Sequence, residues 1–145
     1  MKKNIRRIII AGSCSFNDYG LMCRYLDKYL FDYVNDEIEI VSGHASGADS
    51  LGERYATEHN IKLTIFEAKW KEQGRKAGPI RNTKMVEYAY QNNGELIAFW
   101  NGKSHGTMDT INKVKRKGMK CNIVLYESDE HNRRVTDCSN SAIKG

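Results

Sequence analysis

Three glycine-containing loops in this sequence each follow an apolar run of β-strand character and precede a stretch of helical character. They span residues 11–16, 42–49 and 101–107. In a parallel α/β sheet, every strand-to-helix loop emerges at the same edge, and ligands bind in the crevice where the strand order reverses. Small residues let the backbone approach a ligand, and helix N-termini offer N–H groups and a positive dipole end to an anion. The sequence therefore predicts one pocket for a phosphate-bearing ligand.

Apolar runs and helical patterns alternate along the chain. The predicted strands lie at about 6–11, 38–42, 62–66, 96–100 and 122–126, and the predicted helices at about 19–33, 48–59, 79–91 and 107–117, with a charged loop at 70–76. This alternation predicts an α/β, Rossmann-like domain with a five-stranded, mostly parallel sheet in the order 3-2-1-4-5 and helices on both faces. We expect the domain to span residues 1–126, followed by a polar C-terminal tail at 127–145.

Composition narrows the class of protein. The 145 residues fit a single domain, and no apolar run approaches the ~20 residues of a membrane span. The basic N-terminus is followed by only three isoleucines, too few for a signal peptide, so we expect a cytoplasmic protein. The net charge of +5 suits a polyanionic partner such as a nucleotide or nucleic acid, and it equally fits a solvated, lysine-rich surface.

The four cysteines show neither a CxxC pair nor metal-ligand spacing, and we expect them to be free thiols: Cys14, Cys23, Cys121 and Cys138. The histidines are scattered, so no metal site is expected, and no cofactor is expected either.

The second loop carries the residues best suited to chemistry. Asp49 falls in the first turn of a predicted helix and Glu53 follows four residues later, on the same face. Paired carboxylates can act on a ribose or a glycosidic bond, which makes these two the candidate catalytic residues. The alternative is that Asp49 caps the helix and Glu53 pairs with a nearby cation. His44 is either a ligand contact or a general acid.

Arg81 lies in the first turn of a predicted helix that starts at Pro79, where the helix dipole disfavours a cation. An arginine at this position is explained better by a bound ligand phosphate or by a structural carboxylate than by an exposed surface position. Ser104 and Thr107 are both candidate N-caps of the last helix. The predicted ligand-binding residues are Gly12, Ser13, Gly43, His44, Ser46, Gly47, Arg81, Asn82, Gly102, Ser104, Gly106 and Thr107.

Several separated segments resemble the YspA-like branch of the SLOG superfamily, a Rossmann-like group that includes the LOG cytokinin-activating enzymes and the DprA/Smf fold. The resemblance covers roughly residues 8–126. It rests on Gly12-Ser13, Phe16 and Asp18-Tyr19; on Val41-Ser42-Gly43, Gly47-Ala48-Asp49, Leu51-Gly52 and Arg54-Tyr55-Ala56; on Ala68 and Trp70; on Ala77-Gly78, Arg81-Asn82 and Met85; and on Phe99-Trp100, Gly102, Ser104 and Gly106-Thr107. It implies a protein that binds or processes nucleotides or nucleotide-derived ligands, in a pocket near subunit contacts of a homo-oligomer.

The chain departs from the family pattern at three places. Cys14 and Ser46 stand where the resemblance implies arginines, which removes two cations from the implied pocket. The LOG motif Gly-Gly-x-Gly-Thr-x-x-Glu ends on a glutamate that supports cleavage of the base–ribose bond, whereas Thr110 stands at that place here. Asp109 comes one residue earlier, on a different helix face.

The first interpretation is therefore a binder of AMP-, ADP-, NAD- or ADP-ribose-like ligands. In this interpretation the phosphate lies on Gly106-Thr107 and on the loop at 42–47, while Arg81 neutralises charge and Asp49 contacts ribose hydroxyls. The second interpretation is a hydrolase of an N-glycosidic or phosphate bond in such a ligand, as in the LOG phosphoribohydrolases. The third is a DNA-associated module of the DprA type, although the chain lacks a basic stripe interleaved with aromatic residues.

Overall fold

The structure is a computed structural model that describes residues 4–127. It contains a five-stranded parallel sheet in the order β3-β2-β1-β4-β5, which confirms the predicted fold and strand order. In chain order the elements are β1 (Ile5–Gly12), α1 (Tyr19–Phe31), β2 (Glu37–Ser42), α2 (Ala48–Glu58), β3 (Lys62–Ile65), α3 (Trp70–Gln73), the 3-10 helix η1 (Gly74–Lys76), α4 (Ala77–Tyr90), β4 (Glu95–Trp100), α5 (His105–Arg116) and β5 (Lys120–Leu125).

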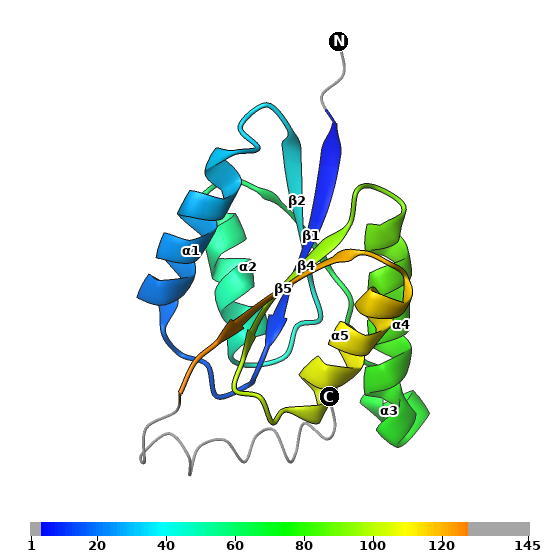
Figure 1. The fold of residues 1–145 in the computed structure, drawn as a ribbon. Helices are drawn as coiled ribbons and strands as arrows, with labels where there is room; N and C mark the ends of the chain where they lie inside the picture. The colour runs from blue at the N-terminus through cyan, green and yellow to red at the C-terminus, as the bar shows by residue number, and fades with distance from the viewer. Residues whose placement is uncertain (1–3, 128–145) are drawn as a thin grey trace.

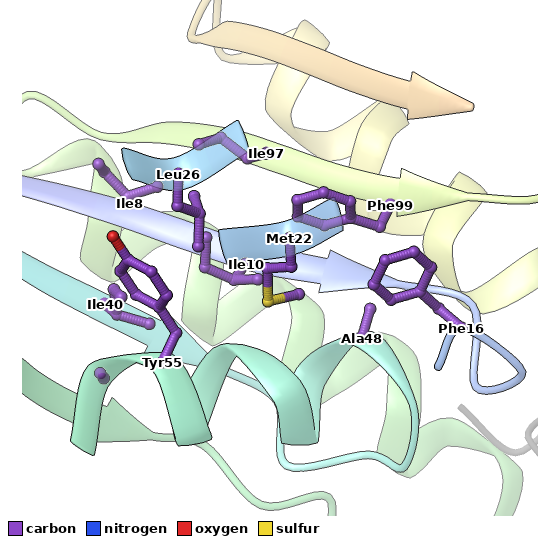
Figure 2. Packing of buried hydrophobic residues seen from close by; sticks show 11 residues of the cluster. Ile8, Ile10, Phe16, Met22, Leu26, Ile40, Ala48, Tyr55, Ile97 and Phe99 are labelled. Atoms are coloured by element: carbon purple, nitrogen blue, oxygen red, sulfur yellow. The ribbon is translucent and has the colours of Figure 1, made fainter. Parts of the chain in front are cut away.

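Helices cover both faces of the sheet, α1 and α2 on one and α4 and α5 on the other (Figure 1). Each face has its own core, because successive side chains of a strand point to opposite faces. Ile8 and Ile10 of β1 pack towards Met22 of α1 and Tyr55 of α2 (Figure 2), whereas Ile9 packs on the α4 and α5 side. The central strand is thus buried on both faces, as expected for a parallel sheet.

The strand order reverses at β1, which pairs with β2 on one side and with β4 on the other. Gly12, the last residue of β1, lies opposite Phe99 near the end of β4. The loops after β1, β2 and β4 therefore emerge together at the carboxyl edge of the sheet, where the sequence predicts the pocket.

The segment at 70–76, predicted as a charged loop, is helical, and this prediction is wrong. The short helices α3 and η1 lead directly into α4, which begins at Ala77 rather than at Pro79. These turns are held by local bonds such as Gln73 N–H to Lys69 O, 2.8 Å, and they bury no side chain, so no apolar period marks them. Arg81 consequently lies beyond the first turn of α4, where the dipole penalty on a cation is smaller.

Asp18 caps α1, since its Oδ1 accepts the Leu21 N–H at 3.0 Å. Of the two candidate caps of α5, Ser104 is the one present, since its Oγ accepts the Thr107 N–H at 3.5 Å. Within residues 4–127, no helix is long and apolar enough to cross a membrane.

Cys23 and Cys121 are free thiols, whereas Cys14 is disulfide-bonded, so the expectation of free thiols is wrong for Cys14. Cys138 and the predicted tail after Glu127 lie outside the described residues.

Candidate functional site

Ser13 joins the three glycine loops. Its N–H donates to Phe99 O at 3.0 Å, its Oγ accepts the Asn101 N–H at 3.0 Å, and its carbonyl accepts the Ala48 N–H at 3.2 Å. The residue is fully buried. The hydroxyl predicted to meet a phosphate is thus engaged inside the protein, and it fixes the loop after β4 against the loop after β1.

Gly47 allows α2 to begin against Ser13. Its φ is +79°, in the region that favours glycine, and a Cβ at this position would lie 2.4 Å from Ser13 O. No side chain fits that space. The glycine therefore brings the N-terminus of α2 to the carboxyl edge of β1.

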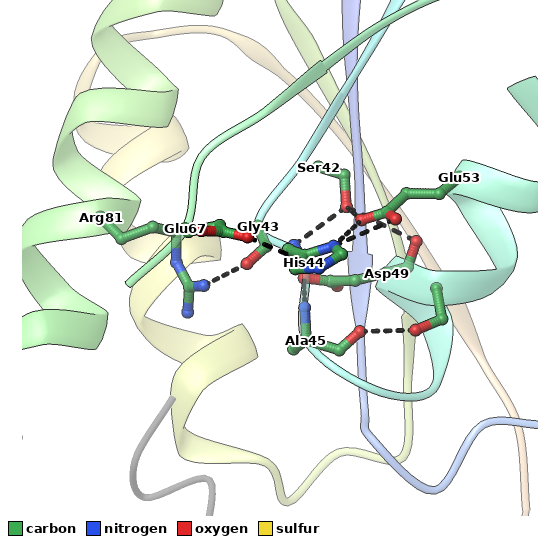
Figure 3. A network of polar contacts seen from close by, with 9 residues as sticks. Ser42, Gly43, His44, Ala45, Asp49, Glu53, Glu67 and Arg81 are labelled. Atoms are coloured by element: carbon green, nitrogen blue, oxygen red, sulfur yellow. Dashed lines mark hydrogen bonds and ion pairs between the residues drawn. The ribbon is translucent and has the colours of Figure 1, made fainter. Parts of the chain in front are cut away.

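Asp49 and Arg81 are buried on either side of Gly43 (Figure 3). Arg81 donates from Nη1 to Gly43 O at 2.5 Å and from Nε to Asn82 Oδ1 at 2.8 Å, and Asp49 Oδ2 accepts the Ala45 N–H at 3.2 Å. A Cβ on Gly43 would lie 3.0 Å from both Arg81 Nη1 and Asp49 Oδ2. Gly43 thus leaves the room that this buried pair of opposite charges occupies.

Burial raises the pKa of Asp49 to about 7, although the charge of Arg81 and the N–H of Ala45 both favour the carboxylate. Burial likewise lowers the pKa of Arg81, against the charges of Asp49 and Asp109. Asp49 is therefore a carboxyl group that gains and loses its proton near neutral pH.

His44 and Glu53 form a second polar group in the same loop. His44 Nδ1 lies 2.9 Å from Glu53 Oε2, and Ser42 Oγ donates to that same oxygen at 2.8 Å. His44 has a φ of +62°, uncommon for a residue other than glycine, and its side chain is 49% exposed. Its Nε2 faces Glu67 Oε1 at 3.7 Å. The hydrogen bond and the charge of Glu53 raise the pKa of His44.

Glu53 therefore orients an imidazole, a partner that the sequence analysis does not foresee. The sequence places Asp49 and Glu53 as a carboxylate pair, with a lysine or arginine as the alternative partner of Glu53. Only the folded loop, in which His44 adopts a left-handed backbone, brings its ring to Glu53.

The third loop is organised by Asn101, which the sequence analysis does not single out. Asn101 Oδ1 accepts the N–H groups of Lys103 at 2.8 Å and Ser104 at 3.0 Å. The signal for it is the Asn-Gly pair after a strand, since an asparagine side chain often bonds to backbone two residues on. Thr107 is buried, and its hydroxyl donates to Ser104 Oγ at 3.2 Å.

Asn82 ties α4 to α5. Its Nδ2 donates to Asp109 Oδ2 at 2.9 Å and to Gly106 O at 3.4 Å, and Asp109 also pairs with Lys113.

The predicted site residues thus form two layers. The buried layer underneath comprises Ser13, Gly43, Asp49, Arg81, Asn82, Ser104 and Thr107. The outer layer, exposed or half-buried, comprises Gly12, His44, Ser46, Gly47, Glu53, Gly102 and Gly106. A ligand at this edge would first contact backbone atoms and His44. The buried polar layer beneath them holds the loops in their conformation.

The comparisons with known proteins bear on this edge. The pattern of the YspA, cpYpsA-related SLOG family matches residues 6–72, which hold the first two loops and the elements that carry them. Over this stretch the chain is similar to the SLOG superfamily. This agrees with the resemblance to the YspA-like branch that the sequence motifs indicate.

One relative is the Gene 61 protein of Mycobacterium phage D29, 28% identical over 127 residues, which cover 79% of this chain and 93% of the relative. Among solved structures, a phenylacrylic acid decarboxylase from Aquifex aeolicus aligns with 100% of this chain and 98% of its own, at 11% identity and a TM-score of 0.34.

Proposed function

We propose that this protein binds a nucleotide or nucleotide-derived phosphate ligand, of the AMP, ADP, NAD or ADP-ribose type, at the carboxyl edge of the sheet. Similarity to the SLOG superfamily over residues 6–72 supports a nucleotide-related ligand. The observation that carries the proposal is that Ser13 contacts both loops that lead into helices at this edge. The Ala48 N–H, at the start of α2, donates to Ser13 O, and the Asn101 N–H, in the loop before α5, donates to Ser13 Oγ. Two helix N-termini at one edge favour an anion there.

The test is thermal unfolding with matched ligands at matched ionic strength. AMP, ADP, NAD and ADP-ribose should raise the melting temperature, and a ligand at 100 times its Kd should stabilise the fold by about 2.7 kcal/mol. Adenosine, which lacks the phosphate, should act far less. Equal shifts for adenosine and AMP, or no shift with any of the four, would contradict the proposal.

A second candidate function is hydrolysis of an N-glycosidic or phosphate bond in such a ligand. The observation that favours it is the pair of proton-transfer groups in the second loop. Asp49 has a pKa of about 7, and the half-exposed His44 is held at Nδ1 by Glu53 while its Nε2 faces the exposed Glu67. A histidine oriented in this way can protonate a leaving group.

Product separation after incubation with the same ligands distinguishes the two candidates. Turnover that falls in His44→Asn and Asp49→Asn but not in His105→Asn, which removes the exposed histidine at the start of α5, would support the hydrolase. Binding without turnover supports the binder alone. Self-association and DNA binding, both implied by the resemblance, stay predictions.

A further inference from the structure

A separate cavity of about 210 Å³ lies between the segment that follows β3 and the helix α4. Ile65, Phe66 and Ile80 form its apolar part. Two of its lining residues contact the loop at 42–47: the Phe66 N–H donates to Ser42 O at 2.8 Å, and Arg81 Nη1 donates to Gly43 O. The cavity therefore lies beside that loop. Glu67, in its wall, is the residue that faces His44 Nε2.

The wall of the cavity has an excess of positive charge. Lys69, Arg81 and Lys84 contribute cations, against the single carboxylate of Glu67. Lys69 and Lys84 are exposed, and the side chain of Glu67 is 71% exposed and turned towards His44. The field in the cavity therefore favours an anion.

Arg81 gives an independent reason to expect a ligand. It is nine-tenths buried, and two of its three guanidinium nitrogens form hydrogen bonds. Nη1 donates to Gly43 O (Figure 3), and Nε donates to Asn82 Oδ1. The third, Nη2, has no hydrogen-bond partner within residues 4–127. A buried donor without a partner costs free energy, and this cost is larger for a charged group. An oxygen of a bound anion would satisfy it.

The size of the cavity restricts what it can hold. Pockets for whole small molecules usually measure about 300–1,000 Å³. A cavity of about 210 Å³ is smaller, so it suits one part of a ligand. An apolar wall next to a cluster of cations fits an anionic group together with the carbon skeleton that carries it.

We propose that this cavity is a subsite for an anionic group, phosphate or carboxylate, of the ligand that binds at the neighbouring loops, with Lys69, Arg81 and Lys84 as its cations. The inference rests on the proposed function for the rest of the ligand. The subsite places one charged end of the ligand beside α4, while the other end lies towards the loops at 42–47 and 101–107.

The test uses Lys69→Met and Lys84→Met, singly and together, with Lys71→Met as the matched control, since Lys71 is an exposed lysine of α3 outside the cavity wall. Inorganic pyrophosphate and ADP are titrated calorimetrically into each protein. We expect the double variant to bind both probes at least about tenfold more weakly, the order expected for lost charged hydrogen bonds, and Lys71→Met to match the parent protein.

Three results would overturn the subsite in different ways. ADP affinity that is unchanged in the double variant, with binding intact in the parent, removes the subsite and leaves the proposed function standing. A parent protein that binds neither pyrophosphate nor ADP removes the subsite, and if AMP, NAD and ADP-ribose also fail to stabilise it, the proposed function fails as well. Pyrophosphate affinity that falls equally in Lys71→Met and in the double variant shows general charge attraction only, and it also overturns the subsite.

Discussion

Arg81 links α4 to the second glycine loop through the Gly43 carbonyl, and it lies next to the buried carboxyl group of Asp49. We predict that Arg81→Ala weakens binding of a phosphate ligand by about 1.5–3 kcal/mol, the range for hydrogen bonds to charged groups. Arg81→Lys should restore only part of the affinity, because an ammonium lacks the planar fork of the guanidinium. Calorimetry on folded protein measures both.

Arg81→Ala should also lower the free energy of unfolding, because it leaves the Gly43 carbonyl without its partner and Asp49 without a nearby cation. Binding is therefore expressed per folded molecule, and Arg75→Ala, which removes an exposed arginine of η1, is the control. Unchanged affinity per folded molecule in Arg81→Ala would mean that Arg81 is structural only.

The sequence indicates that Arg81 needs a partner but not which one. The partner could be a ligand phosphate or a structural group, and one of its contacts is a backbone carbonyl 38 positions earlier in the chain. Such a contact leaves no local pattern. The same holds for His44, whose bond to Glu53 depends on a backbone conformation that histidine seldom adopts.

At the scale of elements, Gly47 can be compared with Gly74, which also has a positive φ, +59°, but where an added Cβ would meet no atom within 4 Å. Gly47→Ala should destabilise the fold by more than about 1 kcal/mol beyond Gly74→Ala, since only Gly47 faces Ser13 O at close range. Urea unfolding of the two variants gives the difference directly. Equal losses would show that backbone strain alone accounts for both, without the contact to Ser13.

The strands and the long helices could be predicted because the spacing of their apolar residues indicates which face is buried. Helix α5, for example, buries Thr107, Thr110, Ile111 and Val114 at helical intervals. The turns at 70–76 bury nothing, so no spacing marks them, and Pro79 suggests a helix start two residues too late. The shift of that start matters, because it moves Arg81 out of the first turn.

At the scale of the whole molecule, Glu39 of β2 connects three strands and a helix from a fully buried position. It accepts hydrogen bonds from Arg7 Nε at 3.2 Å, from Thr64 Oγ1 at 2.6 Å and from the hydroxyl of Tyr88. Burial alone would raise the pKa of Glu39, but these three donors together hold it below its ordinary value.

A carboxyl group whose pKa is lowered by folding stabilises the native state above its unfolded pKa, and this stabilisation is lost as the pH falls through the folded pKa. We therefore expect Glu39→Gln to lower the free energy of unfolding at pH 7 and to flatten its decline between about pH 5 and pH 3. Urea titrations across that range measure both, with Glu67→Gln as the exposed control. A parallel decline in Glu39→Gln and the parent protein would contradict this role.

The whole sheet, with its order and its crevice, follows from the alternation of strands and helices, because right-handed crossovers leave few arrangements. The contacts of the site do not follow in the same way. The pairing of Asn82 with Asp109 and that of His44 with Glu53 involve side chains that only the folded chain brings together.

The bonds that meet at Ser13 have a consequence for how a ligand would bind. Its N–H, hydroxyl and carbonyl each hold a different loop or strand end, so no single loop can swing outwards without breaking one of these bonds. The site would then be ordered before a ligand arrives, so binding would cost little conformational entropy of the protein. Selectivity at such a preorganised edge would come from the charges and shapes around it rather than from a loop that closes over the ligand.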